Sequence, residues 1–154
     1  MRTLRFESRL AASAADVWAV ASTIRGVNQE LMPLMRMTHP PDAPALDDAG
    51  VRPGEIVLRS WLMLGCVLPI DRHTLIFDRL YPGEGFDEHS HSWMQRVWLH
   101  QRRVQADGED ACRVVDSLAF EPRVRFLEIV IAPIVRMLFE HRHRRLRARF
   151  GERR

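Results

Sequence analysis

The 154-residue sequence contains no lysine, two cysteines and one tyrosine. It has no uninterrupted apolar run of about 18 residues, so we expect no transmembrane helix. It also has no G-x-S-x-G segment, which would present a serine nucleophile on a sharp turn, and no glycine-rich phosphate loop. These absences argue against serine-hydrolase, kinase and dinucleotide chemistry. Cys66 and Cys112 allow one disulfide at most, and in a reducing compartment we expect two buried free thiols.

The basic residues are therefore all arginine, and they are unevenly distributed. The net charge is +3, but residues 140–154 hold seven arginines against two glutamates, a balance of +5 that leaves −2 for residues 1–139. Cations at a helix C-terminus complement the helix dipole without a partner, so we interpret the basic end as a solvated helix face. We expect no nucleic-acid partner. The start of the chain is unlike a signal peptide, which predicts a cytoplasmic protein.

Before its C-terminal segment, the chain shows mostly the alternation typical of antiparallel strands. Residues 4–10 alternate between apolar or small and charged side chains, which predicts a half-buried first strand. Ser13 is then expected to cap a helix with Asp16 three residues later, and a second short helix is expected at 27–32. Residues 39–54 contain four prolines, two glycines and no periodicity, which predicts a long surface loop and a candidate lid. Further strands are expected at about 55–64, 72–80, 85–91, 93–105 and 111–120.

The last thirty residues are expected to form one long amphipathic helix. Apolar residues recur there at spacings of three, four or a multiple of them, and the resulting stripe should face the sheet. Pro133 lies within this pattern, so we expect either a kink or a helix that starts near Ala132. The stripe consists of Leu127, Ile131, Ile134, Leu138, Leu146 and Phe150.

This order of a strand, two short helices, several antiparallel strands and a long helix resembles the SRPBCC superfamily, which includes START-like, birch-pollen-allergen-like and polyketide cyclase-like proteins. The resemblance covers residues 1–154 as one domain, and its most specific segments are ASAADVWAV, FDEHSHSWMQRVWLHQR, VVDSLAFEP and FEHRHRRLRARFG. It implies an α+β helix-grip fold, in which a seven-stranded antiparallel sheet wraps around the C-terminal helix and encloses an apolar cavity. It implies no shared catalytic residue, because members range from carriers to enzymes.

A candidate polar site lies on the last two predicted strands. Asp116 shares a face with apolar neighbours, and a buried carboxylate is costly unless it is paired. A turn at 107–108 with three or five loop residues would place His100 opposite Asp116 and Arg102 opposite Val114. A two-residue turn would instead join opposite faces, so the register stays open. His100 and Asp116 are either an acid/base pair at a cavity floor or a polar pair that fixes the register.

The expected function is binding of a small apolar, aromatic or lipid-like ligand in the cavity. One alternative is a cyclase- or dehydratase-like lyase or isomerase, with His100 and Asp116 as acid/base groups and Arg96 or Arg102 orienting an anionic oxygen. A second alternative is a protein-interaction module, and a homodimer stays open. The residues expected to line the ligand site are Met94, Arg96, Trp98, Arg102, Leu118, Phe120, Ile134, Leu138 and His141.

We expect no metal and no cofactor. His89 and His91 would share one face of a strand, as metal-binding pairs often do, but no third ligand follows at a recognised spacing. His141 and His143 are two residues apart on a helix and point roughly 200° away from each other, so they cannot bind one ion together.

Overall fold

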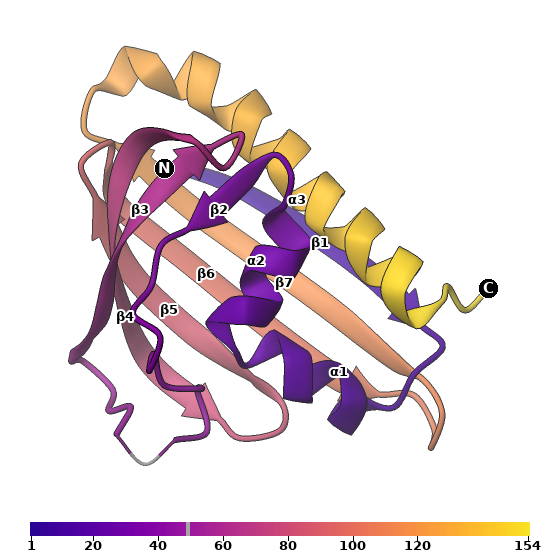
Figure 1. Cartoon of the computed structure of the whole chain (residues 1–154). Helices are drawn as coiled ribbons and strands as arrows, with labels where there is room; N and C mark the ends of the chain where they lie inside the picture. The colour runs from indigo at the N-terminus through magenta and orange to yellow at the C-terminus, as the bar shows by residue number, and fades with distance from the viewer. Residues whose placement is uncertain (49) are drawn as a thin grey trace.

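The computed structural model describes residues 1–48 and 50–154. The expected lid loop at 39–54 includes residue 49, which lies outside the described residues. The described residues form seven strands, three α-helices and one 3-10 helix (Figure 1). The elements are β1 (Arg2–Leu10), α1 (Ala14–Ala21), α2 (Ile24–Leu31), β2 (Met35–Met37), β3 (Ile56–Leu64), β4 (Leu68–Tyr81), β5 (Gly85–Ser92), β6 (Gln95–Ala106), β7 (Cys112–Pro122), η1 (Arg125–Leu127) and α3 (Glu128–Phe150).

The seven strands form one antiparallel sheet in the order β1-β7-β6-β5-β4-β3-β2. The sheet is curled, and α3 lies lengthwise along its β1–β7 side, with α1 and α2 beside it (Figure 1). α3 packs against β1, β7 and α2, and α1 contacts β6. This architecture confirms the predicted α+β helix-grip fold. None of the described helices is both long enough and apolar enough to span a lipid bilayer.

The two short helices begin where the sequence supplies caps. Ser13 Oγ accepts a hydrogen bond from the backbone N–H of Asp16 at 3.1 Å, which confirms the predicted start of α1. Thr23 caps α2 in the same way, so this helix starts three residues before the predicted residue 27. Gly26 is required where α2 approaches α1, because a Cβ there would overlap the carbonyl oxygen of Val20.

The long helix α3 runs from Glu128 to Phe150, in agreement with the expectation of one long C-terminal helix. Pro133 lies inside it, five residues after Glu128, so of the two alternatives for Pro133 a helix start near Ala132 was wrong. A proline so close to the N-terminus removes only one of the first intrahelical hydrogen bonds, and the helix continues from there to Phe150.

The buried face of α3 also differs from the predicted stripe. Ile131 and Leu146 are buried as predicted, but Ile134 is 45% exposed and Leu138 is half-buried beside a cavity. Ile134 and Leu138 belong to the predicted stripe and border the cavity rather than packing on the sheet. The residues buried in addition are Ala132, Val135, Phe139, Arg142 and His143. Arg142 and His143 therefore do not belong to the solvated face that was expected for the basic end.

Buried apolar side chains form two clusters. One contains Phe120 and Phe139 and lies against the first half of α3, and the other contains Trp18 and Leu146 and lies against its last turns. A layer of buried charged side chains from the sheet, α2 and α3 adjoins both clusters, because His100 packs on Phe86 of one cluster and Phe139 of the other. This polar layer and the cavity beside it form the candidate site.

Candidate functional site

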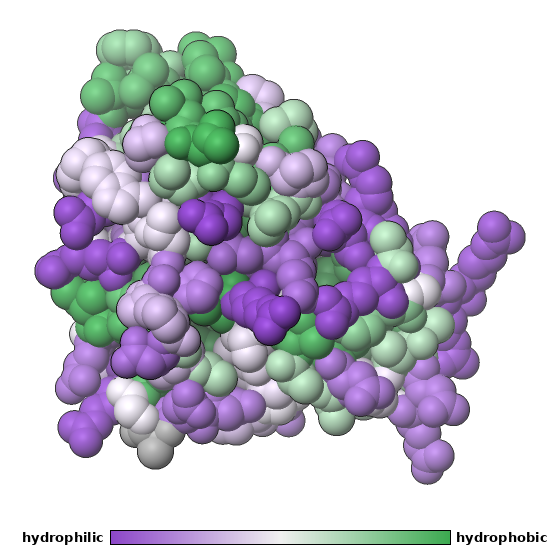
Figure 2. Space-filling model, viewed as in Figure 1, coloured by the Kyte–Doolittle hydropathy of each residue, from purple (hydrophilic) through white to green (hydrophobic). Residues whose placement is uncertain are grey.

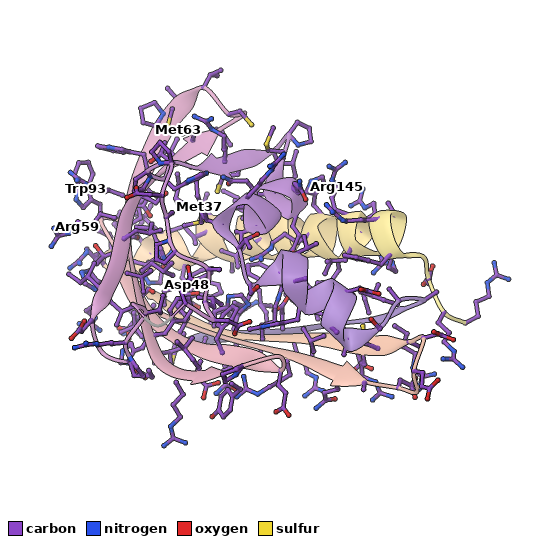
Figure 3. The ribbon with its side chains drawn as sticks, turned by 60° about the horizontal axis from the view of Figure 1, so that its bottom comes forward. Met37, Asp48, Arg59, Met63, Trp93 and Arg145 are labelled. Atoms are coloured by element: carbon purple, nitrogen blue, oxygen red, sulfur yellow. The ribbon has the colours of Figure 1, made fainter. Side chains whose placement is uncertain are left out.

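A cavity of about 230 Å³ lies between the sheet and the helices α2 and α3. Most of its wall is apolar, with Leu31 from α2, Met37 from β2, Leu75 from β4 and Leu138 from α3. Figure 3 shows Met37 between the strands and α2. Leu46 also lines the cavity, so part of the predicted lid loop forms one of its walls.

The sheet side of the cavity is polar. Strand alternation turns His73 on β4, Glu88 on β5 and His100 on β6 toward the cavity, and all three are buried. His73 Nε2 lies 2.9 Å from one carboxylate oxygen of Glu88, and His100 Nδ1 lies 3.3 Å from the other. Burial raises the pKa of Glu88, but the hydrogen bonds and charges of the two imidazoles outweigh it and hold the pKa well below its usual range.

Behind His100 lies the predicted carboxylate, Asp116, which is fully buried. A five-residue loop connects β6 and β7, so His100, Arg102 and Asp116 share one face of the sheet as predicted. The register differs from the predicted one by two residues: His100 is opposite Leu118, and Arg102 is opposite Asp116. His100 still reaches Asp116 diagonally, with Nε2 2.8 Å from Oδ1. Arg102 donates to both Asp116 oxygens, at 2.8 Å from Nε and 2.7 Å from Nη2. The prediction that Asp116 is paired is confirmed, and its predicted position opposite His100 was wrong.

A second buried carboxylate, Glu30 of α2, links this pair to α3. Arg102 donates to its two oxygens at 2.7 and 2.9 Å, and Arg142 Nε donates to one of them at 2.9 Å. Burial raises the pKa of Glu30, but the charges of Arg102 and Arg142 outweigh it and lower the pKa. Buried charged groups therefore connect the sheet to both helices.

His143 of α3 provides a further contact to Asp116. Its Nε2 lies 3.0 Å from Asp116 Oδ2, and its Nδ1 lies 2.8 Å from Ser8 Oγ. Because Ser8 Oγ accepts from Arg147 at 2.8 Å, it can give its own proton to Nδ1 while Nε2 donates to Asp116. Asp116 thus accepts four hydrogen bonds, two of them from Arg102.

The charges of these groups balance when His100 is protonated. Three carboxylates face two guanidinium groups, and both ring nitrogens of His100 face carboxylate oxygens. An imidazole that donates from both nitrogens carries a positive charge, which is the third one required. Burial lowers the pKa of His100, but the charge and hydrogen bond of Asp116 outweigh it and raise the pKa. We call the following residues the buried ionic network: Glu30, Glu88, His100, Arg102, Asp116 and Arg142.

The predicted site residues separate into three groups, which lie behind the cavity surface, border the cavity or lie away from it. Asp116, Arg102 and Leu118 are buried behind the cavity surface, as is Phe120, which packs against Trp98 with ring centroids 5.8 Å apart. The predicted residues that border the cavity are Met94, Trp98, His100, Ile134 and Leu138.

Two predicted residues, Arg96 and His141, are placed away from the cavity. A β-bulge between Gln95 and Val97 breaks the alternation, so Gln95 faces inward and Arg96 faces solvent, where it pairs with Glu121. His141 lies on α3 beyond the cavity, where its Nε2 contacts the carbonyl oxygen of Met32 at 3.0 Å. Neither of these two residues lines the cavity, and the same is true of Arg102, Leu118 and Phe120 behind it.

Sequence reasoning missed five buried polar residues that belong to the buried ionic network or bond to it directly. One signal was available for the helix: positions 142 and 143 fall on the same face as Phe139 and Leu146, at spacings of three and four. A weaker signal was available on β5, where Glu88 and two serines occupy every second position and therefore share one face of the strand. The missed residues are Glu30, His73, Glu88, Arg142 and His143.

Exposed apolar side chains surround one end of the cavity. Ile70 and Ile134 line the cavity and are also 38% and 45% exposed, so they mark its entrance. Figure 2 shows apolar surface gathered at the top of the view, over the start of α3 and the β3–β4 connection. The exposed side chains in these segments and nearby include Leu64, Val67, Leu68, Trp93, Val124, Phe126, Ile129, Val130 and Met137.

Histidine, cysteine and acidic side chains within residues 1–48 and 50–154 form no group of three arranged to hold a metal ion. The histidines near the cavity contact carboxylates of their own network instead. What the arrangement provides chemically is an apolar space with one charged and hydrogen-bonded side.

A seven-stranded antiparallel sheet curled around a long C-terminal helix, with a cavity between them, is the helix-grip fold of the SRPBCC superfamily. The family model of a domain of unknown function, DUF8410, matches residues 8–150, and the chain belongs to this family. A search of curated proteins finds no match.

Solved structures with this fold align with nearly the whole chain. Protein CV1439 from Chromobacterium violaceum superimposes with a TM-score of 0.72 at 11% identity, over 99% of this chain and 100% of its own. A START superfamily protein from Mycobacterium smegmatis has a TM-score of 0.66 at 13% identity, over 96% of each chain. Norcoclaurine synthase from Thalictrum flavum, in complex with dopamine and hydroxybenzaldehyde, has a TM-score of 0.54 at 19% identity, over 93% and 84%. At these identities the likeness is one of fold.

Proposed function

We propose that this protein binds a small, mostly apolar ligand in the cavity between the sheet, α2 and α3. The observation that carries the proposal is the cavity itself, about 230 Å³ in volume, with an apolar wall and few polar groups. An apolar cavity of about 150 Å³ is known to hold benzene, so this space suits one substituted aromatic ring or an aliphatic molecule of similar size.

The buried ionic network supports this proposal by holding the cavity open. Arg102 joins the sheet to α2 through Glu30, and Arg142 joins α3 to the same carboxylate. These buried contacts keep the walls of the cavity at a fixed separation. Preorganised walls lower the entropic cost of ligand binding.

The shared fold adds support of a general kind. The Thalictrum flavum synthase was solved with two small aromatic molecules, dopamine and hydroxybenzaldehyde. The cyclase- or dehydratase-like alternative has less support, because Asp116 accepts four hydrogen bonds and does not border the cavity. A carboxylate held in this way has no free lone pair with which to take a proton from a ligand.

Titration with 1,4-dimethylbenzene by isothermal calorimetry tests the proposal. We expect saturable binding that weakens at least about ten-fold in Leu138→Trp, because the indole ring would fill the cavity. Met137→Trp is the matched control, since Met137 is the neighbouring residue on α3, is 51% exposed and does not line the cavity. Equal binding by both variants, or no binding by the unmodified protein, would contradict the proposal. Native mass spectrometry of protein taken directly from cells would show a retained ligand.

A further inference from the structure

The side chain of Gln95 borders the cavity and lacks a hydrogen-bond partner. Gln95 is 7% exposed, and its Oε1 is the one buried side-chain oxygen or nitrogen without a partner among the described residues. Leaving a buried amide oxygen unpaired is costly, and buried polar groups in folded proteins are nearly always paired.

The backbone fixes the orientation of Gln95. The β-bulge after it turns its side chain inward, and its backbone N–H donates to Ser92 Oγ at 2.9 Å. Ser92 Oγ in turn donates to Asp71 Oδ2 at 2.6 Å, and Asp71 Oδ1 accepts from the backbone N–H of Met94 at 3.1 Å. These neighbours are therefore engaged with one another.

Asp71, Ser92 and Met94 all border the same end of the cavity as Gln95. This corner offers hydrogen-bond acceptors: the free Oε1 of Gln95 and the carboxylate of Asp71. The one donor hydroxyl in it, that of Ser92, is already committed to Asp71. A ligand can therefore satisfy the unpaired Oε1 of Gln95 only with a group that donates a hydrogen bond.

We propose that the ligand carries a hydroxyl group that donates a hydrogen bond to Gln95 Oε1, while its apolar body occupies the rest of the cavity. This inference rests on the proposed function and narrows its ligand to a hydroxylated ring or aliphatic chain. A hydroxyl is favoured because it adds little volume to a ligand for a cavity of about 230 Å³. Gln95 is then a binding residue that stabilises the protein only when the ligand is present.

The test compares 4-methylphenol with 1,4-dimethylbenzene, which differ by a hydroxyl in place of a methyl group. The unmodified protein should bind 4-methylphenol more tightly than Gln95→Met does, while 1,4-dimethylbenzene should bind to both equally or better to the variant. We expect the ratio of the two dissociation constants to change about ten-fold, as one hydrogen bond in a buried site supports. Methionine matches the length of glutamine, so the cavity keeps its shape.

Two further measurements separate this role from a structural one. Without ligand, the melting temperature of Gln95→Met should equal or exceed that of the unmodified protein, because the unpaired amide is removed. Gln101→Met, at an exposed position of β6, should leave the ratio unchanged.

The outcomes distinguish the two proposals. An unchanged ratio in Gln95→Met, with both molecules bound, would overturn this inference and leave the proposed function standing, since water would then satisfy the amide. Binding of neither molecule would overturn the proposed function and this inference with it.

Discussion

Arg102 and Asp116 lie directly opposite each other on β6 and β7 and form a two-pronged ion pair with bond lengths of 2.8 and 2.7 Å. Arg102 is 1% exposed and Asp116 is fully buried. The other end of the same guanidinium group binds Glu30, so a single side chain joins the sheet to α2. Removing one partner of such a pair leaves an uncompensated charge in the interior.

Asp116→Asn should therefore be strongly destabilising. It leaves Arg102 and the protonated His100 with a neutral neighbour, and we expect the free energy of unfolding to fall by about 3–5 kcal/mol. Urea denaturation followed by circular dichroism would measure the change. The matched control is Glu7→Gln on β1, because Glu7 is partly exposed and its ion pairs lie at the surface. We expect that variant to stay within about 0.5 kcal/mol, and a similar effect of both substitutions would contradict the prediction.

Glu30 and Arg142 should be energetically coupled across α2 and α3. Glu30→Gln alone leaves two guanidinium groups without this carboxylate, whereas Glu30→Gln combined with Arg142→Met removes one charge of each sign. We expect the double variant to lose about 1–3 kcal/mol less than the sum of the single variants. A double-mutant cycle from urea denaturation measures this coupling. Additive effects of the two substitutions would show that Glu30 and Arg142 are not coupled and would contradict the prediction.

Stability should fall on both sides of a narrow pH range. Folding lowers the pKa of Glu30, Glu88 and Asp116, so their contribution is complete above the ordinary values of 4.5 and 3.8 and is lost as the pH falls toward the lowered values. Folding raises the pKa of His100, so its contribution is complete below the ordinary 6.5 and is lost as the pH rises through the raised value. The free energy of unfolding should be greatest between about pH 5 and 6.5.

Two histidine variants test the alkaline side of this profile. His100→Gln should remove most of the decline above pH 6.5, because the substituted side chain binds no proton. His89→Gln should leave the decline in place, since His89 is half exposed on the outer side of β5. Urea denaturation at intervals between pH 4 and pH 9 gives the curves. If the decline in stability above pH 6.5 is unchanged in His100→Gln, groups other than His100 cause it and the prediction is wrong.

The two thiols should react at different rates. Cys112 is 1% exposed and burial raises the pKa of its thiol, whereas Cys66 lies half-exposed in the β3–β4 turn. Native protein treated with iodoacetamide should therefore gain one adduct by mass spectrometry, and a second only in denaturant. Cys66→Ser should abolish the fast reaction. The expectation that both thiols are buried was wrong for Cys66, because it follows a glycine at an exposed turn.

Local sequence patterns predicted the secondary structure well, because helix capping and strand alternation depend only on residues close together in the chain. Ser13 caps α1 as expected, and the alternation on β7 correctly placed Asp116 inside. The same pattern failed for Arg96, because a bulge of one residue reverses the face and leaves no clear mark in the sequence. The register of β6 on β7 depended on where the loop begins and ends as well as on its length, because a five-residue loop was among the expected lengths and the pairing still shifted by two residues.

The order of elements, the helix caps and the requirement that Asp116 be paired were determined by the sequence itself, because each follows from periodicity, capping chemistry or the cost of a buried charge. The tertiary structure alone decided which residues pair with Asp116 and with the other buried charges, and where a cavity remains. Arg102 meets Glu30 across 72 positions of the chain, and Arg142 meets it across 112. Such contacts depend on how the sheet curls around α3, and no local pattern encodes that geometry.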